Sequence, residues 1–253
     1  MNYFKFGKGE RNLVILPGLS VESVLESKDL IVEAYQVLEE EFTIYLLDYQ
    51  RDVVETYTIE DMVKDVVDQI EILGLTHVSL FGISLGGMIA MKIASQYPEI
   101  VEQLVLGSTT AEVTPSRYQK IGEWVEDAKR KELEKLCLSF GKTVYPEAFY
   151  LQMEESFRAM AKTITEEERK RFIQFAESIK DFVCLNDLEK ITCPTFVLGD
   201  KQDHVFDEEA TIQIAKHLTS SKRVECYLYD GYGHAVYDMA SDYKERVLRF
   251  LCA

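Results

Sequence analysis

Residues 78–107, VSLFGISLGGMIAMKIASQYPEIVEQLVLG, contain one complete unit of an α/β fold. Continuous apolar runs at 78–81 and 101–106 predict two strands. Between them, residues 85–96 predict a helix, which ends just before Pro98. A strand, a helix and a second strand joined by short turns are typical of a βαβ unit, in which the strands run parallel. Continuous apolar runs also indicate that helices cover both faces of the sheet.

The same alternation of strands and helices extends to both sides of this unit. Further strands are predicted at residues 13–16, 43–47, 195–198 and 224–229. Further helices are predicted at residues 22–40, 59–73, 207–218 and 236–251. The sequence therefore predicts an α/β fold with a mostly parallel central sheet flanked by helices.

Residues 112–181 interrupt this alternation. They contain no strand pattern, and apolar residues recur at helical steps through 116–140, after Pro146 and again towards the end of the segment. The charge changes at the same place, from 7 basic and 18 acidic residues before residue 112 to 13 basic and 14 acidic residues within the segment. We therefore expect a core of residues 1–111 and 182–253 and an inserted, all-helical segment of about three helices.

The composition of the 253-residue chain excludes several classes of protein. It carries 28 basic and 44 acidic residues, a net charge of −16, whereas a nucleic-acid-binding surface is basic. Anionic membrane surfaces are disfavoured for the same reason, and no segment reaches the roughly 20 apolar residues of a membrane span. We expect no nucleic-acid or membrane partner, and the sequence does not specify an oligomeric state.

Cysteine usage indicates a reducing compartment. The five cysteines are an odd number with no CxxC pair and no metal-ligand spacing, which predicts free, mostly buried thiols and no metal site. The N-terminal residues, MNYFKFGKGER, lack the apolar core of a signal peptide. We therefore expect a cytoplasmic protein.

The sharpest chemical motif is a G-x-S-x-G sequence centred on Ser84, between a predicted strand and a predicted helix. In so tight a turn the central residue adopts a strained conformation, and its neighbours two before and two after must lack side chains, as Gly82 and Gly86 do. Such a turn exposes the Ser84 hydroxyl at the carboxyl end of a parallel sheet, where it can act as a nucleophile. The Leu85 N–H, at the start of the helix, can donate to an oxyanion.

A serine nucleophile needs a base, and the chain has four histidines. His77 begins the strand that leads to Ser84, at its far end, and His217 lies inside a predicted helix. His204 is plausible by position, although it adjoins a candidate acid. His234, in the sequence GYGHA, directly follows the last predicted strand, and the neighbouring glycines free its loop to turn back over the sheet. His234 is therefore the preferred base.

The acid that orients the imidazole is predicted in the loop after the strand at 195–198. Asp203 and Asp200 are both candidates. We favour Asp203, because four residues beyond the strand allow the loop to turn toward the neighbouring loop that carries His234.

Together these motifs resemble the α/β-hydrolase superfamily. The order Ser84, Asp203, His234 matches the nucleophile–acid–histidine order of that family. The segments SLFGISLGG, PTFVLGD and GYGHAVYD are similar to its elbow, acid and histidine segments, and the resemblance covers essentially the whole chain. It implies an α/β-hydrolase fold in which residues 112–181 form a helical cap, with no metal or organic cofactor in the reaction.

The resemblance also implies a second oxyanion donor, the Leu19 N–H. The family usually has His-Gly in this loop, whereas this chain has Pro17 and Gly18 before Leu19. The chain also departs from the family in having room for only one short strand, near residues 3–6, before its first parallel strand.

The implied activity is acyl transfer to water from a small-molecule substrate. A serine rather than an aspartate at position 84 argues against the haloalkane dehalogenase and epoxide hydrolase branches of the family. A serine esterase acting on a small to medium ester is the preferred reading. A thioesterase, a C–C bond hydrolase, an aminopeptidase, an acyltransferase and a non-catalytic binding protein remain open.

Overall fold

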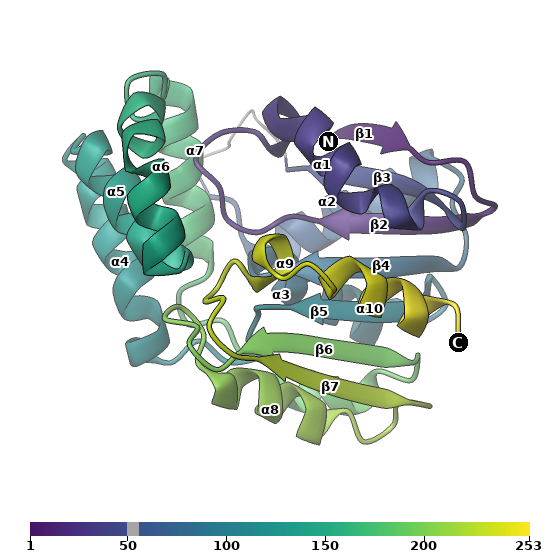
Figure 1. Ribbon diagram of the computed structural model, residues 1–253. Coiled ribbons are helices and arrows are strands. Elements are labelled where there is room, and N and C mark those ends of the chain that lie inside the picture. The colour runs from purple at the N-terminus through teal and green to yellow at the C-terminus, as the bar shows by residue number, and fades with distance from the viewer. Residues whose placement is uncertain (50–55) are drawn as a thin grey trace.

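The structure is a computed structural model that describes residues 1–49 and 56–253 (Figure 1). Over these residues a seven-stranded sheet runs through the molecule in the order β1-β3-β2-β4-β5-β6-β7. The strands are β1 (Asn2–Phe6), β2 (Arg11–Leu16), β3 (Phe42–Asp48), β4 (Val78–Ile83), β5 (Val101–Gly107), β6 (Thr195–Asp200) and β7 (Val224–Tyr229). Every neighbouring pair is parallel except β1 and β3. The predicted mostly parallel sheet is therefore confirmed.

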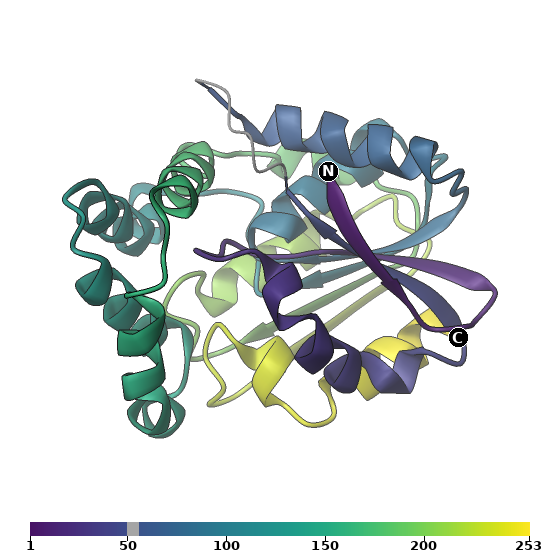
Figure 2. The same ribbon diagram turned by 90° about the horizontal axis from the view of Figure 1, so that it is seen from above.

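Helices cover both faces of the sheet (Figure 2). One face packs against α2 (Ile59–Ile72), α3 (Leu85–Gln96) and α8 (Glu208–His217). The other packs against α1 (Lys28–Tyr35), α9 (Val236–Met239) and α10 (Tyr243–Leu251). Every residue of β4 is buried, as its continuous apolar run predicted. Because parallel strands end at the same edge, the ends of β4, β6 and β7 lie on one side of the molecule.

Four helices separate β5 from β6: α4 (Pro115–Lys129), α5 (Leu133–Val144), α6 (Glu147–Met160) and α7 (Glu166–Ser178). We call residues 115–178 the helical insertion. It lies beyond the carboxyl ends of the parallel strands, in teal and green in Figure 1. A β-bridge between Glu112 and Val183 joins the chain segments that enter and leave the insertion. The side chain of Thr165 caps α7 and forms the capping box with Glu168.

Two predicted helices are interrupted in the structure. Residues 22–40 contain α1, which is only eight residues long, between two 3₁₀ turns. Ser23 caps the first of these turns by accepting the Leu25 N–H, and its Oγ donates to Asp48 Oδ2 at 2.6 Å. The helix predicted at 236–251 is divided into α9 and α10, because Ala240 has extended backbone with ψ of 117°.

The apolar periodicity at residues 116–140 spans two helices rather than one. Lys131 takes a left-handed conformation, with φ of 61°, and ends α4 before α5 begins. The periodicity continues across this break because both helices bury apolar residues on their inner faces. The insertion therefore has four helices where about three were expected.

The insertion and the sheet share one buried apolar cluster. Trp124 and Ile121 of α4 and Phe172 of α7 belong to the same cluster as Val14 of β2 and Leu80 of β4. The insertion is therefore packed onto the sheet through continuous apolar contacts.

All five cysteines are free, and Cys137, Cys184 and Cys193 are buried. The prediction of free, mostly buried thiols is confirmed. Burial raises the pKa of the Cys137 and Cys184 thiols to about 12, so both are protonated at neutral pH and unreactive.

None of the helices in the described ranges has the length and apolar character needed to cross a bilayer.

Candidate active site

The turn between β4 and α3 holds Ser84 in a strained backbone conformation, with φ of 51° and ψ of −116°. Four hydrogen bonds maintain it. The Ser84 N–H donates to the Gly107 carbonyl at 2.9 Å, and the Ser84 carbonyl accepts from the Gly87 and Met88 N–H groups at 2.9 and 3.2 Å and from Thr109 Oγ1 at 2.7 Å. The surrounding structure thus fixes a conformation that an isolated serine rarely adopts.

The glycines around Ser84 are required by close backbone contacts. A Cβ on Gly82 would lie 2.4 Å from the Gly86 carbonyl oxygen, and a Cβ on Gly86 would lie 2.1 Å from the Leu16 carbonyl oxygen. A Cβ on Gly87 would lie 2.6 Å from the Thr109 side chain. The sequence analysis identified Gly82 and Gly86 but missed Gly87, because its neighbour comes from the loop after the next strand.

Three predicted side chains form a hydrogen-bonded chain at the carboxyl ends of β4, β6 and β7. His234 Nε2 lies 3.0 Å from Ser84 Oγ, and His234 Nδ1 lies 2.8 Å from Asp203 Oδ2. All three side chains are buried. The other Asp203 oxygen accepts the Val205 and Phe206 N–H groups at 2.7 and 2.9 Å, which fixes the orientation of the carboxylate.

The rival acid, Asp200, has a different position. One of its oxygens accepts the Gln202 and Gly231 N–H groups, and the other accepts the Tyr232 N–H at 3.0 Å. Asp200 therefore connects the loop after β6 to the loop after β7. Through these bonds it positions the two loops that carry Asp203 and His234.

The other histidines lie away from Ser84. His77 precedes β4 at its opposite end, with φ of 54°. His217 is in α8, where its Nδ1 lies 2.8 Å from the Gln213 carbonyl. His204 is exposed and faces a groove of the helical insertion.

The loop after β2 brings its backbone against Ser84. A Cβ on Gly18 would lie 3.1 Å from Ser84 Cβ, and Gly18 and Leu19 both line the cavity at Ser84. Leu85 is the first residue of α3, so its N–H has no partner within the helix. The predicted oxyanion donors, the Leu19 and Leu85 N–H groups, therefore belong to the two segments that meet at Ser84.

Residues at the end of β3 anchor this loop at two places. The Tyr49 hydroxyl donates to the Pro17 carbonyl at 2.9 Å, and Ser23 Oγ donates to Asp48 Oδ2. Burial raises the pKa of the Tyr49 phenol well above its usual range, so the hydroxyl remains protonated and able to donate. The sequence analysis missed these anchors, because no local motif indicates which loop a residue at a strand end will contact.

The cavity at Ser84 is small and mainly apolar. Its volume is about 20 Å³, close to the space needed for one water molecule. Besides Ser84 and His234 it is lined by Gly18, Leu19, Ile121, Trp124, Phe140, Val144, Ile179, Val205 and Tyr237. The Trp124 Nε1–H donates to Ser139 Oγ at 3.2 Å, outside the cavity lining. The cavity therefore favours an apolar group, and a larger substrate must displace lining side chains.

Within residues 1–49 and 56–253, no three His, Cys, Asp or Glu side chains are grouped closely enough to hold a metal ion. The polar groups described here are a hydroxyl, an imidazole, a carboxylate and backbone N–H groups. This set matches nucleophilic catalysis by an activated serine.

Known proteins share this sequence pattern and this fold. The profile of the alpha/beta hydrolase fold matches residues 13–240. The chain belongs to the α/β-hydrolase fold family. The fold class and family expected from the sequence are confirmed.

Individual relatives of this α/β hydrolase are distant. The serine hydrolase BPHL of Mus musculus is 26% identical over 237 residues, covering 88% of this chain and 73% of that protein. The solved α/β hydrolase MGS-M2, from a Medee basin deep-sea metagenome library, has a TM-score of 0.87 at 22% identity, covering 100% of this chain and 94% of that one. The esterase EaEST from Exiguobacterium antarcticum has a TM-score of 0.80 at 21% identity, covering 99% and 95%. At these identities the solved structures establish the fold alone.

Proposed function

We propose that this α/β hydrolase is a serine hydrolase that cleaves a small to medium carboxylic ester through an acyl-enzyme on Ser84. The observation that carries the proposal is the hydrogen-bonded chain from Ser84 through His234 to Asp203, with distances of 3.0 and 2.8 Å. A buried serine aligned with an imidazole and a carboxylate is the arrangement that activates a hydroxyl for attack on a carbonyl.

In the proposed reaction, Ser84 Oγ attacks the ester carbonyl while His234 Nε2 takes its proton. Asp203 holds the imidazole in the required tautomer and stabilises its charged form. The Leu19 and Leu85 N–H groups stabilise the oxyanion. His234 then protonates the leaving alcohol. In the second half of the reaction, the same histidine activates a water that releases the acid.

Two further observations support an ester with an apolar acyl group. The lining of the cavity at Ser84 is mainly apolar, and the cavity is too small for a bulky acyl chain without movement of Trp124 or Phe140. The mouse relative is named a serine hydrolase, and one structural neighbour is named an esterase.

We also propose that residues 112–181 act as a cap over this site and that residues 1–111 and 182–253 form the catalytic core. The free cysteines favour a cytoplasmic location.

The test is hydrolysis of short-chain 4-nitrophenyl esters by the native protein and the Ser84→Ala variant. Removing the nucleophile should lower kcat by roughly a thousandfold or more. Circular dichroism of the variant controls for folding. Turnover that survives in a folded Ser84→Ala protein would contradict the proposal.

A fluorophosphonate probe separates this enzyme from a non-catalytic binding protein of the same fold. An activated Ser84 should be labelled within minutes, and the label should be absent in Ser84→Ala. A panel of esters, thioesters, aminoacyl amides and β-diketones with matched acyl groups then ranks the bond types. We expect the ester to have the largest kcat/KM.

A further inference from the structure

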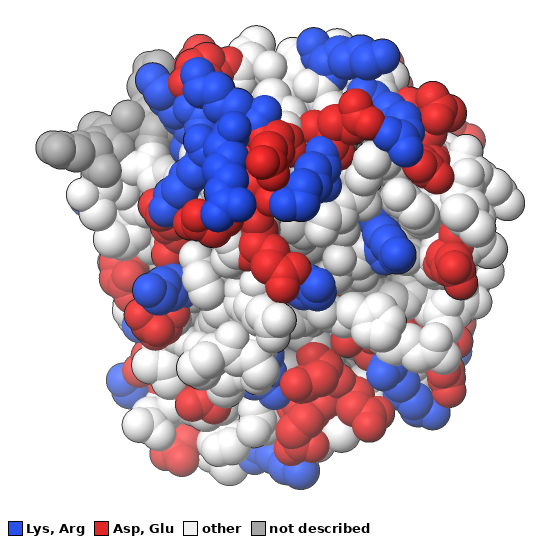
Figure 3. Space-filling view, turned by 90° about the vertical axis from the view of Figure 1, so that its left-hand side faces the viewer, with Lys and Arg blue, Asp and Glu red and all other residues white. Residues whose placement is uncertain are grey.

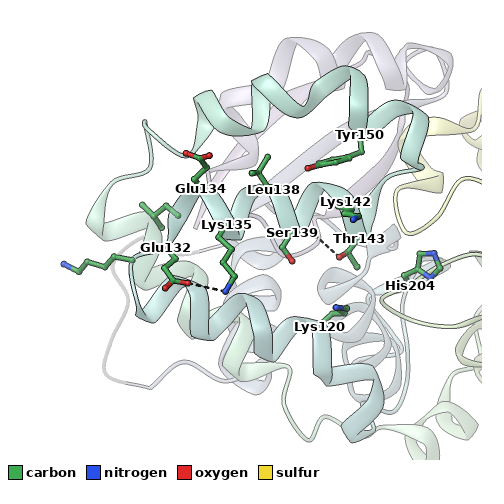
Figure 4. Close-up of a pocket in the computed structure, with 12 residues that line it drawn as sticks. Lys120, Glu132, Glu134, Lys135, Leu138, Ser139, Lys142, Thr143, Tyr150 and His204 are labelled. Atoms are coloured by element: carbon green, nitrogen blue, oxygen red, sulfur yellow. Dashed lines mark hydrogen bonds and ion pairs between the residues drawn. The ribbon is translucent and has the colours of Figure 1, made fainter.

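A groove with a volume of about 1060 Å³ lies on the outside of the helical insertion (Figure 4). It runs along α5 and is bordered by α4, α6 and the loop after β6. Its lining consists of Lys120, Lys131, Glu132, Leu133, Glu134, Lys135, Leu138, Ser139, Lys142, Thr143, Tyr150 and His204. A groove of this size can hold a small organic molecule, whereas the cavity at Ser84 cannot.

The groove and the cavity at Ser84 are lined by opposite sides of the same segments, which form a wall between them. At four places in the chain, one residue lines the groove and the next residue lines the cavity. These pairs are Lys120 and Ile121, Ser139 and Phe140, Thr143 and Val144, and His204 and Val205. The wall therefore consists of α4, α5 and the loop after β6. A molecule in the groove lies directly outside the catalytic cavity.

The groove has a basic end. Figure 4 shows Lys120, Lys142 and His204 toward one end, with Glu132 and Glu134 toward the other. Lys120 pairs with Glu123 Oε2 at 2.8 Å, whereas Lys142 and His204 have no hydrogen bond or ion pair with any described residue. By contrast, the carboxylates at the far end face lysine or arginine partners, as Glu134 faces Arg158. The free cationic groups thus lie where an additional anion could bind.

This basic end is unusual for so acidic a chain. The protein has a net charge of −16, yet residues 112–181 contribute 13 of its 28 lysines and arginines. Figure 3 shows lysine and arginine side chains gathered on the face of the molecule that carries the insertion. Since residues 1–111 and 182–253 together carry a net charge of −15 and residues 112–181 only −1, this distribution favours the approach of anions at the insertion.

The geometry at His234 indicates which part of a substrate points to this end. In the proposed mechanism His234 protonates the leaving alcohol, so the alcohol lies on the His234 side of the cavity. The next residue, Ala235, donates its N–H to the Val144 carbonyl at 3.0 Å. The C-terminal end of α5 therefore borders the leaving-group side, and Thr143 and Lys142 are the next residues toward the groove.

We propose that the groove binds the alcohol part of the ester, and that this part carries an anionic group held by the free Lys142 and by Lys120, whose exposed pair with Glu123 is weak enough to exchange for the substrate. This inference rests on the proposed function, since it extends the same site. The apolar acyl group and the ester carbonyl lie in the cavity at Ser84, and the leaving group extends between displaced side chains of the wall to its charged end in the groove. The substrate class is therefore an ester of a small apolar acid with an anionic alcohol.

The test uses two substrates that differ by one charge. The acetate esters 4-acetoxybenzenesulfonate and 4-acetoxybenzenesulfonamide have the same acyl group and ring, but only the sulfonate is anionic at pH 7. We expect the kcat/KM of the native protein to be about tenfold higher for the sulfonate, and the ratio to fall as salt is raised. The double variant Lys120→Gln/Lys142→Gln should reduce this ratio to near one.

The control is the double variant Lys64→Gln/Lys216→Gln, which changes the net charge by the same amount on exposed faces of α2 and α8. It should retain the native ratio. A native ratio near one, or a ratio equally high in Lys120→Gln/Lys142→Gln, would overturn the groove as the leaving-group site. If Ser84→Ala hydrolyses both esters at the native rate, the proposed function itself fails, and this outcome is distinguishable from failure of the groove alone.

Discussion

At the residue scale, Asp200 at the end of β6 and Asp203 in the loop after it have separate tasks. Both are buried, and both accept backbone N–H groups. Only Asp203 contacts the imidazole of His234. Asp200 instead accepts a backbone N–H from the loop after β7, just before His234. The difference arises because the loop reverses after Asp200 and returns toward β7 at Asp203.

This division of tasks predicts different effects of two isosteric substitutions. Asp203→Asn should lower kcat by roughly a thousandfold or more, because an amide cannot stabilise the imidazolium. The fold should be retained. Asp200→Asn should instead lower the free energy of unfolding by about 1–2 kcal/mol, because it weakens bonds between two loops. Steady-state kinetics and urea unfolding of both variants distinguish the roles. Equal kinetic effects of the two substitutions would contradict this assignment.

At the element scale, one face of α7 packs against the end of β3. Arg171 and Phe175 are one turn apart on this face, and Phe175 makes an edge contact with the Tyr49 ring at 5.7 Å. Arg171 is buried, its Nη1 lies 3.8 Å from Asp48 Oδ2, and its Nε has no hydrogen-bond partner among the described residues. Since Asp48 and Tyr49 also anchor the loop beside Ser84, α7 contacts the residues that position that loop.

The buried pair of Arg171 and Asp48 predicts non-additive substitutions. Arg171→Met should lower the free energy of unfolding by about 2–4 kcal/mol, because it leaves the Asp48 carboxylate buried without its cation. Adding Asp48→Asn should recover part of this loss, because the remaining charge is then removed. Urea unfolding of the two single variants and the double variant measures the coupling. Strictly additive losses would show that the two side chains do not interact.

At the scale of the whole molecule, the helical insertion and the sheet share one apolar core. If the insertion separates from the sheet, apolar residues of both parts become exposed to water. Unfolding should therefore be cooperative although the chain is long. The small cavity at Ser84 follows from the same packing, because Trp124 and Phe140 of the insertion fill the space above the sheet.

The shared core predicts a single unfolding transition. Trp124 is the only tryptophan, and it lies in the insertion. Its fluorescence therefore follows the insertion, while far-ultraviolet circular dichroism follows the whole chain. We expect the two urea midpoints to coincide. A fluorescence transition at clearly lower urea would mean that the insertion unfolds before the sheet.

The sequence alone determined the features that depend on neighbours in the chain. Apolar runs and helical periodicity predicted most of the strands and helices, because burial imposes local repeats of two or 3.6 residues. The turn at Ser84 was predictable because the glycine spacing around the serine is a local motif and Gly82 avoids a contact within the same βα unit, although Gly86 avoids the Leu16 carbonyl of the neighbouring strand β2. Where helices were interrupted, at Ala240 and Lys131, the apolar pattern continued through the break and did not reveal it.

Only the tertiary structure decided which distant residues meet. His234 and Ser84 are 150 positions apart, and the contact of Asp203 rather than Asp200 with His234 depends on how two loops turn beyond their strands. The anchors at Asp48 and Tyr49 likewise connect loops from different strands. These contacts depend on the order in which strands pair in the sheet, and local sequence patterns carry no information about that order.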